Sequence, residues 1–333
     1  MREVAVVTTG FFDGVHLGHR HVLETVVSCA RERGEEATVV TFWPHPRAVL
    51  QQDAREFRLL TSLEEKKQLL LAAGINRVEV LPFTREFAAL KAEEYLQLRH
   101  ERFGATVIVM GYDNRIGSDR KTAVEMCPPS TVGCADPSHG KPWAPPSYVA
   151  EGGHGLSEDT SLQPVILIVD ELHRESETSS CHSERSEESH LSSTIIRRAL
   201  EQGRVEEANA MLGYQYGLYG VVVAGNRQGR TMGFPTANMQ LYEPLKLVPA
   251  DGVYAVEVEV LGSVHKGMCN IGLRPTVDGK VRTIETHILD FDQDIYGLPL
   301  RLRFVRRIRD ERKFPSLEAL REQLLLDALN CKK

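Results

Sequence analysis

The sequence predicts an α/β plus β architecture: a domain built on a parallel sheet, followed by an antiparallel β-barrel closed by a C-terminal helix. The chain has 333 residues, about the length of two domains. Over residues 1–120, short β-branched runs alternate with helix-like segments. From residue 217, strand-like runs follow one another without a helix until residue 316. The first pattern is typical of a parallel sheet covered on both faces, and the second of a barrel.

In the first domain, three segments are expected to be helices: 18–33, 62–73 and 92–103. The expected strands are 4–8, 38–42, 77–81, 106–110 and, much later, 165–169. The ligand site of a parallel sheet lies beyond the carboxyl ends of its strands. His16, His45 and Asp113 each come soon after a predicted strand, so we expect them to converge at that edge.

The composition changes between residues 121 and 191. Residues 127–163 are rich in Pro, Gly and Ser, and residues 175–190 are polar with few apolar side chains. Neither segment can bury enough apolar surface to offset the entropy of ordering. We therefore expect two insertions, one on each side of the fifth strand. A helical segment follows these insertions. We therefore divide the chain into a first domain, 1–190, a helical linker, 191–216, and a second domain, 217–333. The linker is expected to contribute to the first site.

The second domain is predicted to consist of short strands punctuated by Gly, Asn and Asp, and of one terminal helix at 316–329. The expected strands are 219–224, 252–260, 264–271, 283–289 and 300–306.

Composition limits the class of partner. The net charge of −6 argues against a general nucleic-acid binder. Six scattered cysteines without a CxxC pair indicate a reducing compartment. The chain begins directly with a strand-like run, and no apolar run approaches 18 residues. We therefore expect a soluble, cytoplasmic protein with small-molecule substrates and no membrane or nucleic-acid partner.

The stretch TTGFFDGVHLGHRHVL, residues 8–23, joins the first predicted strand to the first predicted helix. Glycines let the backbone approach phosphates, and a helix N-terminus offers unpaired N–H groups. The imidazoles of His16 and His19 titrate near neutral pH and can donate to oxyanions. This arrangement favours a nucleoside triphosphate site for nucleotidyl transfer. A buried structural pair of histidines is the alternative.

A second phosphate element is suggested by Ser192, Ser193 and Thr194, which precede Arg197. Hydroxyl side chains at a helix start are usually N-caps, which is the alternative interpretation. An arginine one turn later is placed to hold a triphosphate by bidentate contacts.

In the second domain, GRTMGFPTAN at 229–238 follows the first predicted barrel strand. It is either a simple hairpin or a phosphate loop that ends in a metal-binding hydroxyl of the kind that suits Mg²⁺. The pattern GxxxxGK[ST] is absent, so this is not a P-loop. Strand alternation places Glu285 and His287 on one face. Glu285, predicted to face inward, is either a paired structural carboxylate or a catalytic one.

The chain resembles the bacterial bifunctional riboflavin kinase/FMN adenylyltransferase family, the FAD synthetases. In the first domain the matching runs are GFFDGVHLGH (10–19), TFWPHPRAVL (41–50), GYDNRIG (111–117) and SSTIIR (192–197). In the second domain they are GRTMGFPTAN (229–238), CNIGLRPTVDG (269–279), IETHILDFDQDIYG (284–297) and IRDERKFPS (308–316). The resemblance implies a Rossmann-like HxGH nucleotidyltransferase domain followed by a riboflavin kinase barrel.

The resemblance implies two reactions: riboflavin and ATP give FMN, and FMN and ATP give FAD and pyrophosphate. Two alternatives stay open. One is a riboflavin kinase with weak or lost adenylyltransferase activity, suggested by the insertions and by Asn114 and Ile116, where the family usually has aromatics in a GxDFxFG motif. The other is a non-catalytic module that senses a flavin or a nucleotide.

The resemblance also implies roles for residues of both sites. His16 and His19 stabilise charge on the α- and β-phosphates, and His45 and Asp113 border the FMN pocket. Further ATP contacts of the first site are implied for Gly10, Phe12, Asp13, Gly18, Ser193, Thr194 and Arg197. In the second site, Glu285 is the base that takes the proton from the riboflavin 5′-hydroxyl. Mg²⁺ and the ATP phosphates of that site are assigned to Thr236 and Asn238, with Gly229 and Gly233 in the phosphate loop.

Overall fold

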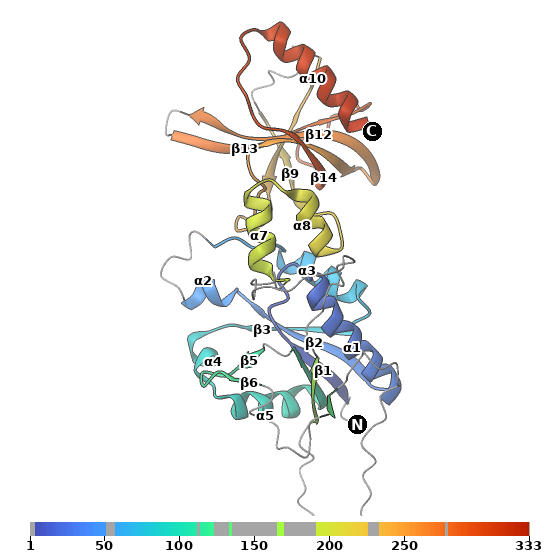
Figure 1. Cartoon of the computed structure of the whole chain (residues 1–333), viewed down its shortest axis with the longest axis vertical. Coiled ribbons are helices and arrows are strands. Elements are labelled where there is room, and N and C mark those ends of the chain that lie inside the picture. Colours follow the sequence, from blue (N-terminus) through green and yellow to red (C-terminus); the bar gives the residue numbers. More distant parts are fainter. Residues whose placement is uncertain are drawn as a thin grey trace, which may run out of the picture. The chain divides into compact units, whose positions relative to one another are not determined.

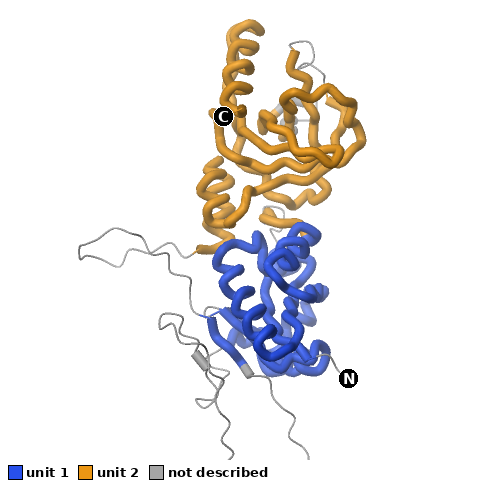
Figure 2. Tube along the Cα trace, turned by 90° about the vertical axis from the view of Figure 1, so that its right-hand side faces the viewer, with its two compact units in different colours: residues 1–57, 63–186 blue, residues 58–62, 187–333 orange. Residues whose placement is uncertain are grey.

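The computed structural model describes residues 4–50, 57–111, 114–122, 133–134, 165–169, 191–225, 233–276 and 279–332. The chain divides into two compact units (Figure 2): Met1–Phe57 with Leu63–Ser186, and Arg58–Ser62 with Glu187–Lys333. Of the expected insertions, only Gly133 and Cys134 lie within the described residues. Asp113 and Gly229 lie outside them.

The first unit contains a six-stranded sheet in the order β3-β2-β1-β4-β8-β7, and each neighbouring pair is parallel. Its strands are β1 (Ala5–Thr9), β2 (Glu36–Trp43), β3 (Arg77–Pro82), β4 (Ala105–Gly111), β7 (Gly133–Cys134) and β8 (Val165–Val169). Strands covered on both faces are nearly continuous apolar runs, and all of β1 is buried. The predicted parallel sheet is confirmed.

Helices cover both faces of this sheet (Figure 1). The described helices of this unit are α1 (Leu17–Arg33), α2 (Pro46–Leu50), α3 (Leu63–Ala72), α4 (Arg85–Ala89) and α5 (Ala92–Phe103), of which α2 lies to the side of the sheet. Val6 shares one core cluster with Leu23 of α1 and Leu70 of α3. Val7 shares another with Tyr95 of α5. Because successive strand residues point to opposite faces, α1 and α3 cover one face and α5 covers the other.

The order in which the strands are added reverses at the centre of the sheet, between β1 and β4. From β1 it continues to β2 and β3 on one side, whereas β4 and β8 lie on the other side. Such a switch leaves a crevice outside the carboxyl ends of the strands. The HLGH element follows β1 directly. GYDNRIG follows β4 and contributes a short hairpin, β5 (Arg115–Ile116) with β6 (Lys121–Thr122).

The second unit is a closed barrel in the order β10-β13-β12-β11-β14-β9, in which each neighbouring pair of strands is antiparallel. Its strands are β9 (Gly217–Val223), β10 (Ala237–Leu241), β11 (Gly252–Val260), β12 (Ser263–Thr276), β13 (Gly279–Ile288) and β14 (Pro299–Arg309). The predicted barrel with its terminal helix is confirmed. Strand β10 was not predicted, because its sequence ANMQL has no β-branched residue.

Two helices, α7 (Ser193–Glu201) and α8 (Val205–Leu212), pack on the barrel. Ile196 and Leu212 join the cluster that fills the barrel interior. The segment Arg58–Ser62 also belongs to this unit. Leu59 forms a parallel β-bridge with Lys246, whose Nζ donates to the Leu60 carbonyl at 2.7 Å.

The terminal helix α10 (Leu317–Lys332) lies against the outer face of the barrel. Asp327 is 0% exposed and accepts from Arg309 at the end of β14, with Oδ2 at 2.9 Å from Nε and 2.8 Å from Nη2. Its other oxygen accepts from Gln323 at 2.7 Å. A buried carboxylate with this many donors fixes the helix to the strand.

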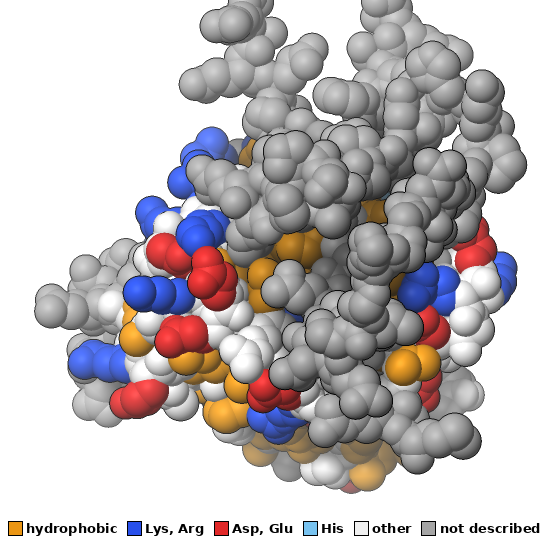
Figure 3. Space-filling view, turned by 90° about the horizontal axis from the view of Figure 1, so that it is seen from below, with side chains coloured by type: hydrophobic (Ala, Val, Ile, Leu, Met, Phe, Trp, Pro, Cys, Tyr) orange, Lys and Arg blue, Asp and Glu red, His pale blue; other side chains and the backbone are white. Residues whose placement is uncertain are grey.

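On the face seen in Figure 3, Lys and Arg side chains lie interspersed with Asp and Glu side chains. Neither sign of charge dominates the described part of that face, unlike a surface that tracks a phosphate backbone. No described helix combines the length and hydropathy that a membrane-spanning segment requires.

We expect Asp327→Ala to lower the free energy of unfolding by about 3 kcal/mol, because it leaves the Arg309 guanidinium without its buried partner. Asp290→Asn is the surface control, since Asp290 pairs with Lys332 at 3.1 Å with its side chain 81% exposed, and Asn tolerates its φ of 55°. That substitution should cost less than about 1 kcal/mol. Urea unfolding followed by circular dichroism measures both, and equal losses would contradict the assigned role of Asp327.

Candidate active sites

The HLGH element begins in a tight turn at the end of β1. Phe12, Gly14 and Val15 have φ angles of 47°, 86° and 38°, all in the left-handed region. That conformation costs energy for a bulky or β-branched residue. Phe12 and Val15 are both buried in the cluster under α1, so packing holds the turn in place.

His16 is the N-cap of α1. Its Nδ1 accepts from the backbone N–H of His19 at 3.3 Å, and the two imidazole rings stack with centroids 3.6 Å apart. Because Nδ1 is the acceptor, a neutral His16 carries its proton on Nε2. The ring is thus oriented as an N–H donor at the helix N-terminus, where an anion is favoured.

His19 lies one turn into α1, with its ring edge-on to Phe12 at 5.2 Å. Burial lowers the pKa of His19 well below its usual value, and the charges of His16 and Lys66 lower it further. The ring is therefore neutral at neutral pH. Its Nδ1 is buried and has no hydrogen-bond partner within the described residues. A phosphate oxygen would satisfy such a nitrogen if the ring carried its proton there.

Lys66 joins this site from α3, although the sequence analysis did not single it out. It is only 2% exposed, and its Nζ donates to Thr41 Oγ1 at 3.3 Å and lies 5.2 Å from the Phe11 ring centroid. Burial lowers the pKa of Lys66 to about 8, and the charge of Asp13 opposes this shift. A positively charged side chain beside HLGH can neutralise phosphate charge.

An aromatic cavity of about 470 Å³ lies beside the HLGH turn, at the carboxyl ends of β1 and β4. Five aromatic side chains line it: Phe11, Phe42, Phe83, Phe87 and Tyr95. His45 borders it through Phe11, since the two ring centroids are 4.0 Å apart. Phe11 thus connects the aromatic cavity with Lys66 and the HLGH element. A flat aromatic ligand suits such a wall.

The SSTIIR segment forms the first turns of α7. Ser192 is the N-cap, and its Oγ accepts from the Ile195 N–H at 3.5 Å, as the capping alternative predicted. Ser193 and Thr194 lie in the first turn, and Arg197 Nε donates to the Arg58 carbonyl at 2.9 Å. All these residues belong to the second unit. Their role in ATP binding stays a prediction.

Glu285 lies on β13, directly opposite Asn270 of β12 and Asn238 of β10. Its Oε1 accepts from Thr283 Oγ1 at 3.3 Å. Glu285 and His287 line the same cavity, of about 730 Å³, so the prediction that they share a face is confirmed.

That face is the outer one, which corrects the expectation that Glu285 points into the barrel. The neighbouring residues Ile284 and Ile288 fill the barrel interior. The cavity lies between the barrel wall and α10, whose Leu320 and Leu324 form part of its far side.

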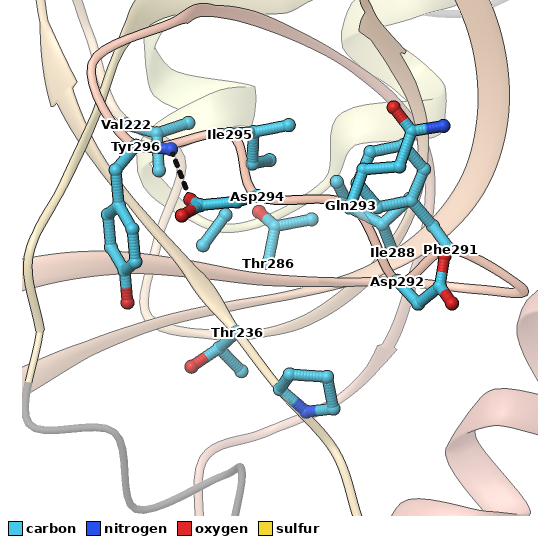
Figure 4. Close-up of a pocket in the computed structure, with 12 residues that line it drawn as sticks. Val222, Thr236, Thr286, Ile288, Phe291, Asp292, Gln293, Asp294, Ile295 and Tyr296 are labelled. Atoms are coloured by element: carbon cyan, nitrogen blue, oxygen red, sulfur yellow. Dashed lines mark hydrogen bonds between the residues drawn. The ribbon is translucent and has the colours of Figure 1, made fainter.

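Thr236 lies between two cavities. It lines the cavity of Glu285 and also a smaller one of about 290 Å³, shown in Figure 4. The segment from Phe291 to Tyr296 surrounds the smaller cavity, where Asp294 Oδ1 accepts from the Tyr296 N–H at 3.1 Å. His287 Nδ1 lies 2.8 Å from the carbonyl oxygen of Pro235 and so fixes the backbone just before Thr236.

Thr236 and Asn238 fit the predicted magnesium site by their chemistry. Both are on the half-exposed side of the segment, whereas Ala237 and Met239 enter the core. Asn238 lies against Gly225, where a Cβ would come within 2.1 Å of its Nδ2. A hydroxyl and an amide carbonyl are hard oxygen donors of the kind that Mg²⁺ accepts alongside phosphate oxygens. No cluster of three or more His, Cys, Asp or Glu ligands occurs among the described residues.

Comparison with known proteins assigns both units. A family model for FAD synthetase matches residues 1–132, and one for riboflavin kinase matches residues 212–333. The bifunctional riboflavin kinase/FMN adenylyltransferase of Bacillus subtilis is 33% identical, over 97% of this chain and 90% of that protein. The Escherichia coli K12 protein of the same description is 32% identical, over 100% of this chain and 93% of its own. The chain belongs to the bifunctional riboflavin kinase/FMN adenylyltransferase family.

A solved structure supports the fold over the whole chain. A crystal structure from Streptococcus pneumoniae, described as a macrolide-efflux protein, has a TM-score of 0.81 and 30% identity. The match covers 100% of this chain and 95% of that one. The predicted family and fold class are both confirmed.

The chain departs from the expected family pattern at Asn114 and Ile116, and the structure shows what these residues do. Asn114 Nδ2 donates to the Thr9 carbonyl at 3.3 Å and so ties the end of β1 to the segment after β4. Ile116 is buried in the cluster under α5. Both residues line the aromatic cavity. Asn114 and Ile116 are therefore part of the cavity wall in this chain.

Lys66 is one of the residues near HLGH that sequence reasoning missed. A signal was present, because Lys66 lies four residues before the buried Leu70 on the apolar face of α3. A lysine at a core position of an amphipathic helix indicates either an internal partner or a ligand.

Proposed function

We propose that the second unit converts riboflavin and ATP to FMN and that a site built on HLGH converts FMN and ATP to FAD and pyrophosphate. The observation that carries the proposal is the position of Thr236, which borders two cavities with Glu285 facing the larger one. Phosphoryl transfer requires two substrates to meet at one point. Thr236 lines both cavities, so the two substrates would meet beside it.

In the kinase reaction, the larger cavity accepts riboflavin and the smaller one accepts ATP. Apolar side chains suited to flavin rings line the larger cavity, among them Phe234, Met268 and Leu320. An alcohol is a poor nucleophile at neutral pH, so Glu285 takes the proton of the 5′-hydroxyl as it attacks the γ-phosphate. Magnesium bound with ATP would be held by Thr236 and Asn238 and would neutralise phosphate charge.

The adenylylation reaction needs no base, because the attacking FMN phosphate oxygen is already ionised. Positioning and electrostatic stabilisation supply the catalysis. His16, His19 and Lys66 stabilise the charge that develops on the α- and β-phosphates. Gly10, Phe12, Asp13 and Gly18 shape the loop around ATP, and FMN occupies the aromatic cavity with His45 and Asp113 at its border.

Three further assignments belong to this proposal. Ser193, Thr194 and Arg197 bind the triphosphate in the adenylylation reaction. Gly229 and Gly233, the latter with a φ of 84°, belong to the loop that covers the ATP phosphates in the kinase reaction. Riboflavin, FMN and ATP with Mg²⁺ are the small molecules involved, and the cytoplasm is the expected location.

A product time course tests the proposal. The full chain is incubated with riboflavin, ATP and Mg²⁺, and flavins are separated by chromatography while pyrophosphate is measured. FMN should appear first, followed by FAD with one pyrophosphate for each FAD. Accumulation of FMN alone would select the kinase with lost adenylyltransferase activity. Binding of flavin without turnover of either substrate would select the sensing module.

We expect Glu285→Gln to abolish FMN formation while FAD formation from added FMN continues, because only the first reaction needs a base. The loss should be at least about 100-fold, the usual contribution of general base catalysis. Glu257→Gln is the matched control, since Glu257 is a half-buried barrel carboxylate on β11 that pairs with Arg303. Loss of both activities in Glu285→Gln would contradict separate sites.

We also expect kcat/KM for ATP in FAD formation, which reports the site before ATP binds, to fall as the pH rises through about 8. Burial lowers the pKa of Lys66 to about 8, so the ammonium group is present below that pH and lost above it. In Lys66→Arg the alkaline fall should move to higher pH, because guanidinium stays protonated. An alkaline limb that stays in place in the variant would show that another group titrates. Kinase activity at each pH serves as the internal control.

A further inference from the structure

Arg99 is a buried cation in the wall of the aromatic cavity. It lies on α5, is 0% exposed, and lines the cavity together with Tyr95. Its Nη2 donates to the Tyr95 hydroxyl at 2.6 Å, and its guanidinium carbon lies 4.2 Å from the centroid of that ring. Its Nε and Nη1 are buried without a hydrogen-bond partner among the described residues.

This arrangement is costly for the free protein. A buried donor left unpaired costs about 1–3 kcal/mol, and more for a charged group. Burial also lowers the pKa of Arg99, and only the neighbouring Tyr95 opposes that shift. The described residues that line the cavity include Arg99, Arg115 and Arg120 and no carboxylate. A ligand that brings acceptor atoms would satisfy the guanidinium.

The remaining wall specifies the shape of that ligand. Three aromatic rings pack in a row along the wall. The ring centroid of Phe87 lies 5.2 Å from that of Phe42 and 5.5 Å from that of Tyr95. A volume of about 470 Å³ lies in the range of small-molecule sites. The cavity therefore suits a planar aromatic molecule that carries acceptor atoms on one edge.

We propose that Arg99 binds the pyrimidine edge of the FMN isoalloxazine ring, donating its unpaired N–H groups to the ring carbonyl oxygens. The inference rests on the proposed function of the first unit. The contact with Arg99 would fix the orientation of FMN, because α5 covers the sheet face opposite the one covered by α1. The ring edge therefore points to α5, and the phosphate points past Phe11 to Lys66 and the HLGH element.

Arg99→Met in the full chain tests this orientation. In FAD formation, KM for FMN should rise roughly 10- to 100-fold, the range expected for a lost hydrogen bond to a charged group. KM for ATP and the riboflavin kinase rate should stay unchanged. Lumiflavin, which has the isoalloxazine ring without the ribityl phosphate, serves as a competitive inhibitor against FMN. Its Ki should rise by the same factor as KM for FMN.

Two variants complete the design. Arg102→Met alters an exposed arginine of the same helix and should leave all constants unchanged. Arg99→Lys keeps the charge and should give a smaller rise in KM for FMN, which keeps the test decisive if Arg99→Met folds poorly. An unchanged KM for FMN in both Arg99 variants would overturn the proposal. So would a raised KM with an unchanged lumiflavin Ki, since Arg99 would then bind the phosphate end.

Failure of the proposed function can be told apart from failure of this inference. If the unaltered chain makes no FAD from FMN and ATP, FMN binding is measured by calorimetry instead. Arg99→Met should then weaken one class of FMN site, whereas Arg102→Met should not. Equal dissociation constants for FMN in the two variants would overturn the role of Arg99 independently of catalysis.

Discussion

The first site depends on the reversal of strand order between the parallel neighbours β1 and β4. Parallel strands can be joined only by crossovers, so the segments that leave these two neighbours turn to opposite sides and leave a crevice between them. HLGH leaves from β1 toward the face covered by α1, and the aromatic cavity opens toward α5. The crevice thus has one polar end with histidines and Lys66, and one apolar end with five aromatic rings. A substrate that is aromatic at one end and a phosphate at the other matches this division.

The barrel separates core from site by the two-residue period of its strands. On β13, Ile284, Thr286 and Ile288 are buried, whereas Glu285 and His287 face the cavity under α10. An outer barrel face would ordinarily be solvated. Helix α10, fixed by the buried contact between Asp327 and Arg309, turns this part of the face into a cavity wall. Glu285 therefore lies half-buried in a cavity and not on a solvated outer surface.

Much of this arrangement could be predicted from the sequence, because periodicity and β-branched runs mark strands whatever their partners are. What could not be predicted required knowledge of long-range packing. Alternation showed that Glu285 and His287 share a face, and Ile284 and Ile288 indicated that the opposite face is the interior, but no local pattern showed that α10 covers the outer face. The bridge between Leu59 and Lys246 joins segments 187 positions apart and leaves no local pattern. The position of Lys66 on the apolar face of its helix was a local signal, but only the fold shows that Lys66 and Arg99 are both buried.

The two reactions make opposite demands on charge, and the two units meet them differently. The kinase must remove a proton from an alcohol, so it needs an anionic base within reach of the substrate. Adenylylation joins two phosphates that repel each other, so it needs positive charge and donors without a base. In the first unit, burial keeps His19 neutral and draws the pKa of Lys66 down to about 8, because no carboxylate fully offsets the desolvation. Binding of the triphosphate would supply the missing negative charge and raise both pKa values. If ATP binds at the proposed site, His19 and Lys66 would take up protons as the triphosphate binds, which would couple binding to the charge state that the reaction requires.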